Sequence, residues 1–566
     1  MPRTALFSHL QHLVALARFG RQHGLRDPAA IRAAARAASG DPSRREALSA
    51  LAATLAATAL PLGTSGCNKG RRIAIVGGGV AGVHCAYRLN QGELACTLFE
   101  AEDRLGGRMF TGRDQFLDGQ ICELGGELID TNHATLWQLS EELGIALDDR
   151  QGGAYADLEV ETFWVDGALV SAETLLDQLI EVVDDIQADY DAAESDDDAY
   201  AALDVESLTD WLERRIPRAQ YAELHVVLDV AYRGEYGLEN DEQSALNLIY
   251  LLGLSTDAFY IFGDSDERYH THLGNDTFVT EMAATLPEGT VALSHRLTRA
   301  EGDGPYQLTF DTPDGEVTET FDKVVFALPY SVLRTLDIAD LTLTDEKRQI
   351  VMELGYGTNA KVMAGFSRPV WREDHGASGT ATADLPFQQS WDSSLGQAGD
   401  SAILTNFLGG DQGVASGEGT AEGWIEQEVL PGLDLVFPGT ADAFTGTAVR
   451  MHWPTVASAL GSYTCYRPGQ WTWWSLEGEQ EGDLHFCGEH TSPDFQGWME
   501  GAAESGARVA EEIFADLGEP VPEAMRGLSR LRRAMPPIGR DGRNALRSLR
   551  ERREILQAWA ALHGRG

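Results

Sequence analysis

The sequence predicts an α/β fold built around a Rossmann-like β-α-β unit, and three observations support this prediction. A short segment rich in β-branched residues, 73–76, precedes a glycine-rich turn. A helix is predicted directly after the turn, over 80–89. A second strand, over 96–99, follows the helix and ends in an acidic residue, Glu100. Strand, turn, helix and strand in this order form the unit from which parallel sheets are assembled.

The turn has the spacing Gly-x-Gly-x-x-Gly, and each of its glycines has a separate mechanical role. Gly77 permits a tight turn, Gly79 lets backbone amides approach a pyrophosphate, and Gly82 lets helix and strand pack closely. The N-terminus of the helix then faces the phosphates. Glu100 can accept hydrogen bonds from both hydroxyls of a ribose and would repel a 2′-phosphate. These four residues together predict a dinucleotide-binding site.

The chain of 566 residues is long enough for two or three domains with sizeable cores. Its formal net charge is -44, and the acidic excess is concentrated in 71–520 because both ends of the chain are net basic. Such an acidic surface repels nucleic acid and anionic membranes, so neither is an expected partner. The six cysteines form no CxxC pair, and His270 and His272 have no third ligand near them in the sequence. We therefore expect no metal site.

The first 70 residues resemble a bacterial export signal of the twin-arginine type. Arg44 and Arg45 form the twin arginine, an uncharged Ala/Leu-rich run follows, and small residues precede Cys67. We expect a periplasmic or cell-surface protein, with Cys67 as its lipid-anchored first residue if the lipoprotein-like sequence GTSGC is cleaved. The protein stays in the cytoplasm if the signal is not functional. The run is too short and too rich in alanine to predict a membrane-spanning helix.

The segment EAEDRLGGRM, which begins at Glu100, distinguishes FAD from NAD as the dinucleotide. It resembles the segment after the ribose-binding acid in flavoprotein amine oxidases, where an arginine and two glycines line the cofactor. Here these residues are Gly106, Gly107 and Arg108. An NAD dehydrogenase has no need of this second glycine pair and arginine. The resemblance therefore implies FAD.

Five further segments match the same family in the same order. The chain thus resembles a bacterial FAD-dependent amine oxidase, of the superfamily of monoamine, polyamine and L-amino-acid oxidases. ELGGELID resembles the loop that passes the flavin, DKVVFALPYSVLR the strand that closes the FAD domain, and GTNAKVMAGF the segment with the family's lysine. The other two segments are DERYHTHLGNDTFVTEMAATL and LHFCGEHTSPDFQGWMEGAAESGARVAEEI. Together the segments span almost all of 71–515.

The resemblance implies a discontinuous domain organisation. A Rossmann-like FAD-binding domain of the p-hydroxybenzoate-hydroxylase-like type is assembled from 71–146, 271–350 and 455–516. Residues 147–270 and 351–454 then build an inserted α+β substrate domain. The fold class is therefore α/β for the cofactor part and α+β for the insert.

Two charged stretches lie outside these motifs. The acidic run 184–204 falls in the first insert, where we expect a solvated helix and loop rather than a metal site. The basic tail 517–566 includes a predicted helix with apolar positions, which we expect to dock on the acidic surface of the protein itself. The sequence leaves open whether the protein is a monomer or a homodimer.

The C-terminal segment carries several cofactor contacts. Gly488 lets the backbone approach the cofactor, and Glu489 can bond a ribityl or ribose hydroxyl. A helix that opens at 497–499 points its amides at the flavin, which stabilises negative charge on the reduced ring. The full set of predicted cofactor contacts is Gly77, Gly79, Gly82, Glu100, Arg108, Gly125, Gly126, Glu127, Leu297, Gly488, Glu489, Trp498 and Met499.

Lys361 is the predicted catalytic lysine. It is one of four lysines in the chain and precedes an apolar run, 362–366, that reads as a buried strand. In the family, a lysine near flavin N5 holds a water, and its charge helps oxygen to accept electrons. The sequence GTNAK assigns this role to Lys361, in preference to a lysine whose ammonium reaches solvent. Trp498 is the second predicted catalytic residue, as one wall of an aromatic cage.

The substrate residues are predicted in front of the flavin. Trp498 matches one of the two aromatic positions that sandwich the amine in monoamine oxidases. The other position falls near 461–462, where no aromatic residue stands, and either Tyr463 or Trp471 could substitute. Asp130 falls near a position where some polyamine oxidases hold an acid, and an acid there would attract a cationic substrate.

The predicted reaction is hydride transfer from an amine carbon to flavin N5, followed by hydrolysis of the imine and reduction of O2 to H2O2. Cys465 lies several residues from the position of the covalent flavin cysteine of animal monoamine oxidases, so FAD is expected to be noncovalent. An amine or polyamine is favoured over an L-amino acid because the loop after Gly126 carries acids and no arginine. Arg233 or Arg268 could still bind a carboxylate, so an L-amino-acid oxidase stays open. Further alternatives are a flavin desaturase or dehydrogenase, a flavoprotein without turnover and an interaction protein with a decayed fold.

Overall fold

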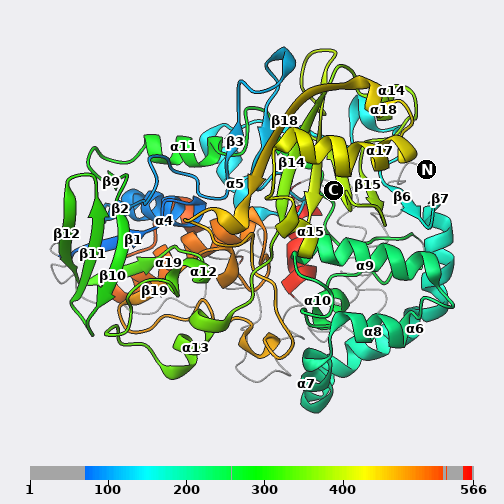
Figure 1. The fold of residues 1–566 in the computed structure, drawn as a ribbon. Helices are drawn as coiled ribbons and strands as arrows, with labels where there is room; N and C mark the ends of the chain where they lie inside the picture. Colours follow the sequence, from blue (N-terminus) through cyan, green and yellow to red (C-terminus); the bar gives the residue numbers. More distant parts are fainter. Residues whose placement is uncertain (1–70, 257, 527–530, 532–551, 562, 564–566) are drawn as a thin grey trace, which may run out of the picture.

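The predicted β-α-β unit lies at the centre of a five-stranded sheet in the computed structural model of the chain (Figure 1). The structure describes residues 71–256, 258–526, 531, 552–561 and 563. The strand order is β19-β13-β1-β2-β9, and every neighbouring pair is parallel. The predicted α/β class is thus confirmed. The strands are β1 (Ile73–Val76), β2 (Thr97–Phe99), β9 (Val291–Ala292), β13 (Lys323–Phe326) and β19 (Leu484–Phe486).

Continuous apolar runs explain why these strands lie inside. All four residues of β1 and all four of β13 are buried, as is typical of parallel strands that are covered on both faces. The helix α4 (Val80–Gln91) connects β1 to β2 and packs against α19 (Met499–Leu517). Two shorter helices, α11 (Thr277–Ala284) and α5 (Ala134–Leu143), pack beside them. The two ends of the sequence range 71–516 are therefore neighbours in space.

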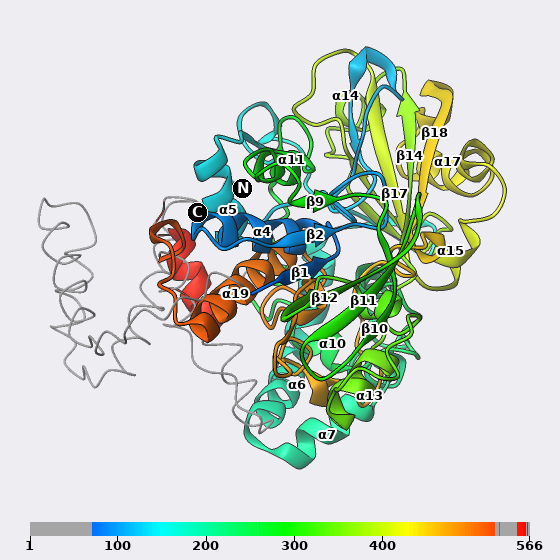
Figure 2. The same ribbon diagram turned by 90° about the vertical axis from the view of Figure 1, so that its left-hand side faces the viewer.

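A three-stranded antiparallel sheet flanks the parallel sheet (Figures 1 and 2). The ring of Phe99, at the end of β2, stacks on Phe310 of this sheet at 4.2 Å between centroids, and Phe321 meets Phe99 edge-on at 5.7 Å. This contact fixes the small sheet beside Glu100, the next residue of the chain. The strands are β10 (Arg296–Glu301), β11 (Tyr306–Thr312) and β12 (Gly315–Phe321).

A second large sheet has seven strands in the order β18-β14-β17-β16-β15-β6-β7. All seven residues of β14 are buried, and β14 pairs antiparallel with both of its neighbours. The sheet draws its strands from both sequence ranges that were assigned to the substrate domain. The strands are β6 (Thr162–Val165), β7 (Ala168–Val170), β14 (Ala360–Phe366), β15 (Ala381–Ala383), β16 (Gln389–Asp392), β17 (Ala402–Leu408) and β18 (Phe444–His452).

Helices gather beside the seven-stranded sheet, toward the lower right of Figure 1. The acidic run 184–204 forms the end of one helix and most of the next, and many of its side chains are exposed as expected. Asp189 is an exception, because it is buried and binds Arg215 and the indole N–H of Trp211. The helices are α6 (Ala172–Ser195), α7 (Asp197–Val205), α8 (Leu208–Arg215), α9 (Ala222–Tyr236) and α10 (Leu246–Ile249).

Part of the basic tail forms a helix over 552–561, drawn in red in Figure 2. Arg552 makes two hydrogen bonds of 2.7 and 2.6 Å with the carboxylate of Asp494, which is fully buried. Leu556 packs with Ala134 and Phe495 in a small apolar cluster. This helix therefore docks on the body of the protein through both charge and apolar contact.

Two predictions about the N-terminal region, the twin arginine at 44–45 and the lipid attachment at Cys67, lie outside the described residues. Among the residues that are described, no helix combines the length and the apolar character needed to cross a membrane.

Candidate active site

A cavity of about 690 Å³ is lined by residues from both large sheets. Its wall includes the glycine-rich loop after β1, the loop 125–128, the loop before α19, and side chains of β14 to β17. Two helices begin at the cavity, α4 after Gly79 and α19 after Trp498, and no side chain caps the N-terminus of either helix. The cavity thus meets two sets of backbone N–H groups that have no partner within their helix.

The glycine-rich loop has the geometry that its spacing predicts. Gly77 adopts a φ of +112°, and a Cβ atom there would lie 2.4 Å from the carbonyl oxygen of Ala327. Gly82 does not line the cavity; a Cβ atom there would lie 2.0 Å from the oxygen of Gly77, so glycine lets helix and turn pack closely. Gly79 lies on the wall, and the nearest atom to its Cβ position is 3.9 Å away.

Glu100 lies in the cavity wall at the end of β2, as predicted. One carboxylate oxygen accepts a hydrogen bond from the N–H of Gly78 at 2.6 Å, and the other accepts one from Glu102 at 2.8 Å. Burial raises the pKa of Glu100, although these two bonds act in the opposite direction. Leu297 of β10 lines the same part of the cavity and is buried. The carboxylate is therefore held in one orientation.

Glu489 lines the cavity, but the protein itself occupies both of its oxygens. One oxygen accepts from Arg108 at 3.0 Å, and the other accepts from the N–H of Gly497 at 3.0 Å and the hydroxyl of Thr464 at 3.1 Å. Arg108 also donates to the backbone oxygen of Ser462 at 2.5 Å. In this arrangement Glu489 positions Arg108 and the loop that begins α19.

Lys361 lies in β14, with a side chain that is 7% exposed and faces the cavity rather than bulk solvent. Its ammonium donates to the oxygens of Gly125 at 2.7 Å and Glu123 at 3.2 Å, and to the carboxylate of Glu127 at 2.8 Å. It also lies 5.1 Å from the ring centroid of Trp391. An ammonium has three donors, so all three are used by the protein. Its contribution at the cavity wall is therefore its charge.

Glu127 forms the other half of this buried ion pair. It lines the cavity and is 6% exposed. Burial alone would raise the pKa of Glu127, but the charge and hydrogen bond of Lys361, together with the charge of Arg150, outweigh burial and lower it to about 2. The carboxylate is therefore ionised at neutral pH and holds Lys361 in place.

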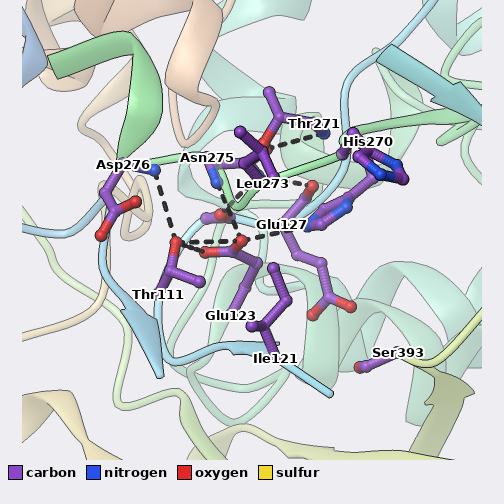
Figure 3. A network of polar contacts seen from close by, with 12 residues as sticks. Thr111, Ile121, Glu123, Glu127, His270, Thr271, Leu273, Asn275, Asp276 and Ser393 are labelled. Atoms are coloured by element: carbon purple, nitrogen blue, oxygen red, sulfur yellow. Dashed lines mark hydrogen bonds and ion pairs between the residues drawn. The ribbon is translucent and has the colours of Figure 1, made fainter. Parts of the chain in front are cut away.

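A buried network fixes the loop that carries Glu127 (Figure 3). Glu123 accepts hydrogen bonds from the hydroxyl of Thr111 at 2.9 Å and the N–H of Asn275 at 2.9 Å, and it lies 3.0 Å from His270. The amide of Asn275 donates to the backbone oxygen of Glu127 at 2.7 Å. Glu123 ends β4 (Cys122–Glu123), and His270 lies in β8 (Tyr269–Thr271). The histidine thus pairs with an acid in this network.

Trp498 and Tyr463 both line the cavity, as predicted. Gly497 directly precedes Trp498, and its Cβ position is 3.4 Å from the Tyr463 ring. The hydroxyl of Tyr463 donates to the backbone oxygen of Glu235. The alternative aromatic, Trp471, is not in the cavity wall; it is buried and donates to Asn247 at 2.9 Å. Tyr463 is therefore the aromatic residue that accompanies Trp498.

The prediction that Asp130 contacts substrate is wrong in this structure. Asp130 is 3% exposed and does not line the cavity. Its carboxylate accepts a hydrogen bond from the N–H of Glu267 at 2.8 Å and lies 3.4 Å from His133. Burial raises the pKa of Asp130 to about 6. Glu267 reaches the cavity instead, and Asp130 holds it in place by accepting a hydrogen bond from its backbone N–H.

Neither arginine considered for a carboxylate clamp reaches the cavity. Arg233 pairs with Asp229 at 2.5 Å and with Glu239 at 3.1 Å. Arg268 pairs with Asp149 at 2.7 Å. Both side chains are therefore engaged by acids elsewhere.

Four acidic residues of the wall were not predicted from the sequence: Glu102, beside Glu100, and Glu161, Glu235 and Glu267 on the substrate-domain side. The three residues of the substrate-domain side come from distant parts of the chain, with no motif around any of them. Glu235 is the second-last residue of a helix and Glu161 stands directly before a strand, which are ordinary places for a solvated acid. The fold alone brings them to one wall.

A family model described as flavin-containing amine oxidoreductase matches residues 80–514 of this chain. The chain belongs to this family. The predicted resemblance is thus confirmed: the protein is a flavin amine oxidoreductase, and its cofactor is FAD. Enzymes of this kind take an amine and O2 as substrates.

Known relatives of this amine oxidoreductase cover most of its length. The flavin-containing amine oxidase B of Sus scrofa is 26% identical over 477 residues, which are 80% of this chain and 87% of that protein. An L-amino-acid oxidase of Mus musculus is 23% identical over 480 residues, 81% and 73% of the two chains. A solved putrescine oxidase with bound putrescine has a TM-score of 0.66 at 22% identity, covering 79% of this chain and 99% of that one. The last match shows a shared fold.

The residues of this amine oxidoreductase fit FAD. The uncapped N-terminus of α4 offers free N–H groups and the positive end of a helix dipole to a pyrophosphate. The uncapped N-terminus of α19 offers the same to an electron-rich ring. Glu100 stands at the end of β2, where it can accept from ribose hydroxyls. The cavity wall therefore offers one group for each part of FAD: the N-terminus of α4 for the pyrophosphate, Glu100 for the ribose and the N-terminus of α19 for the flavin ring.

The described cysteines of this amine oxidoreductase lie away from the cavity. None of the five described cysteines lines its wall. Cys465 is buried, and its sulfur accepts from Asn247 at 3.7 Å. Burial raises the pKa of the Cys465 thiol. Among the described residues, no thiol is thus placed for a bond to the flavin.

Proposed function

We propose that the protein is an FAD-dependent oxidase of primary or secondary amines, and that it disfavours L-amino acids. The observation that carries this proposal is the charge of the cavity wall. Its substrate-domain side presents three acidic side chains, Glu161, Glu235 and Glu267. Lys361, a cationic side chain of the same wall, is paired with the carboxylate of Glu127. Such a wall attracts a cation and repels a carboxylate.

FAD, which the N-terminus of α4 and Glu100 would hold, would supply a hydride acceptor for the carbon beside the amine nitrogen and a route for the electrons to O2. The amine becomes an imine, which water hydrolyses to a carbonyl product and ammonia or a smaller amine. O2 takes up two electrons and two protons and leaves as H2O2. The protein supplies orientation: Trp498 and Tyr463 flank the space in front of α19, and Lys361 adds a fixed positive charge near it.

An L-amino-acid oxidase is the second candidate, and the mouse relative bears that name. Such an enzyme needs a cation for the substrate carboxylate. Arg108 is the arginine of the wall nearest to this region, and its guanidinium already binds Glu489 and the oxygen of Ser462. Arg296 also lines the cavity, but it stands in β10 near Glu100 and pairs with Asp311. The charge of the wall therefore favours an amine.

A peroxide-coupled screen of the purified protein tests this proposal. We expect H2O2 release with 1-aminobutane, benzylamine or 1,4-diaminobutane, and none with L-leucine, L-phenylalanine or L-arginine. Release of one equivalent of H2O2 per O2 consumed distinguishes an oxidase from a dehydrogenase. Activity confined to the L-amino acids would overturn the preference for amines.

We also propose that FAD is held noncovalently, because no described cysteine lines the cavity. Acid precipitation of the yellow holoprotein is expected to release all of the flavin into the supernatant. The absorbance of the supernatant near the flavin maximum, compared with that of the native protein, measures the released fraction. Flavin that stays in the washed pellet would contradict this prediction.

A further inference from the structure

The three glutamates of the cavity wall come from elements that are distant in sequence. Glu161 directly precedes β6, Glu235 lies in the last turn of α9, and Glu267 stands two residues before β8. Each is half-buried, and each lines the cavity. Within the described part of the chain, no side chain forms a hydrogen bond or ion pair with any of the three carboxylates. These acids face the cavity without a protein partner.

Glu267 is held rigidly at this wall. Its N–H donates to Asp130 at 2.8 Å, and both neighbours in the chain are anchored. Asp266 accepts from the N–H of Thr131 at 2.9 Å, and Arg268 pairs with Asp149 at 2.7 Å. The side chain of Glu267 therefore projects from a fixed loop.

Two neutral polar side chains beside the glutamates also lack a protein partner. Gln389 and Thr382 are each 8% exposed and line the cavity, and neither side chain has a hydrogen bond to the described residues. They lie directly opposite each other on β16 and β15. A Cβ atom on Gly234 would lie 2.1 Å from the amide oxygen of Gln389, so this amide lies against the helix turn that carries Glu235. Buried polar groups normally have a partner, and here the free side is the cavity.

The strand pairing of the seven-stranded sheet gives the separation between the glutamate side of the cavity and Lys361. Lys361 pairs with Phe407, Phe407 pairs with Gln389, and Gln389 pairs with Thr382, so the four residues form one row across the strands. Neighbouring strands lie about 4.8 Å apart, which places Gln389 about 10 Å from Lys361 along the sheet. Phe407 stands between them and lines the cavity. A substrate that spans this distance would thus lay an apolar stretch along Phe407.

The unpaired carboxylates favour a cationic ligand. Burial raises the pKa of Glu161 to about 7 and that of Glu235 to about 7. Burial, followed by the charges of Glu235, Asp130 and Glu161, raises the pKa of Glu267 well above its usual range. Arg150 offsets part of this effect on Glu267, but it does not line the cavity, and it donates to the backbone oxygen of Asp392. A ligand cation among the three acids would relieve this mutual repulsion.

We propose that Glu161, Glu235 and Glu267, together with the amide of Gln389, bind the second ammonium group of an aliphatic diamine or polyamine whose first amine is oxidised near Lys361. The inference deepens the proposed amine oxidase function and rests on it. The methylene chain between the two nitrogens lies along Phe407 and the neighbouring wall. A monoamine of equal length fills the same apolar stretch and leaves the acids without a partner.

Binding is measured first with ligands that cannot react. The probes are 2,7-dimethyloctane-2,7-diamine and 2-methyloctan-2-amine, because neither carries hydrogen on the carbon beside nitrogen and the diamine has the same six-carbon spacing between its nitrogens as 1,6-diaminohexane. Titration calorimetry of the oxidised holoprotein is expected to give a Kd for the diamine at least 10-fold lower than that for the monoamine. Glu235→Gln and Glu267→Gln are each expected to remove most of this difference. Glu159→Gln, at an exposed acid two residues from Glu161 and outside the cavity wall, is the matched control and keeps the difference.

Turnover is measured with 1,6-diaminohexane and 1-aminohexane. We expect each of the two cavity variants to lower kcat/KM about 10-fold or more for the diamine, through KM, and less than about 2-fold for the monoamine. Equal binding of the two unreactive probes, or a difference that survives in Glu235→Gln and Glu267→Gln, overturns the subsite while the amine oxidase function stands. Diamine binding that the variants abolish, in a protein that oxidises no amine, supports the subsite and overturns the proposed function.

Discussion

Replacement of Lys361 by methionine is expected to leave FAD bound and to slow the oxidation of the reduced flavin by O2 about 100-fold or more. The ammonium is a fixed positive charge in the cavity wall, and O2 becomes negatively charged as it accepts the first electron. The methionine variant keeps the length of the side chain but leaves the negative charge of Glu127 in its place. Stopped-flow mixing of anaerobically reduced protein with oxygenated buffer measures the rate.

Glu127→Gln is the matched control for this variant. Both substitutions break the same buried ion pair, and each is expected to lower stability by about 3–5 kcal/mol because one charge is left unpaired. Their effects on reoxidation should differ, because Glu127→Gln keeps the ammonium and removes its counter-charge. Reoxidation in Glu127→Gln is therefore expected to be as fast as in the unmodified protein or faster.

The double variant, Lys361→Met with Glu127→Gln, separates charge from folding. It removes both charges, so its stability should recover toward that of the unmodified protein, whereas its reoxidation should stay slow. Equal slowing in Lys361→Met and Glu127→Gln would refute an electrostatic role for Lys361. Loss of flavin from Lys361→Met alone would instead assign the lysine to cofactor binding or folding.

The alanine variants at Gly82 and Gly79 are expected to fail in different ways. A methyl group at Gly82 would lie 2.0 Å from the backbone oxygen of Gly77, so Gly82→Ala should destabilise even the flavin-free protein, by about 1–3 kcal/mol or more. Gly79 has a φ of −69°, which alanine adopts readily, and no atom lies within 3.9 Å of its Cβ position. Gly79→Ala should leave the stability of the apoprotein unchanged.

Flavin affinity provides the second measurement for this pair. Gly79→Ala is expected to weaken FAD binding about 10-fold or more, because the added methyl group occupies cavity space beside the amides of α4. Denaturation of the apoprotein and titration with FAD measure the two quantities separately. An unstable Gly79→Ala apoprotein, or a Gly82→Ala variant with normal stability, would contradict the roles assigned to the two glycines.

The local parts of the cofactor site could be read from the sequence because each part is contiguous. The strand 73–76 was predicted with the bounds it has, and the helix after it extends two residues beyond the prediction. Gly77, Gly79 and Gly82 act within one turn, so their spacing alone fixes their relation. The acid at the end of the second strand follows from the same unit. These predictions depend on backbone geometry that neighbouring residues determine.

The substrate wall could not be read in this way because tertiary packing assembles it. Glu235 lies in a helix, whereas Glu161 and Glu267 stand in segments just before two different strands, and each has the local surroundings of a surface acid. Asp130 was placed near the right region, but its carboxylate turns to the N–H of Glu267 and not to the cavity. The choice between Tyr463 and Trp471 likewise depended on where one loop points. A sequence places a residue on an element, and the packing of elements decides which side chains share a wall.

The residues at the two ends of the cavity differ in how much their substitution would disturb the fold. Lys361 stands in β14, where all seven residues are buried between two paired strands, and a substitution there disturbs the centre of a sheet. Glu267 and Glu161 stand outside regular strands, at positions that tolerate replacement more easily. On the roles proposed above, the residue that handles oxygen belongs to the scaffold, while the residues that select the amine stand where substitution disturbs the fold less. A change of substrate would then leave the centre of the seven-stranded sheet unaltered.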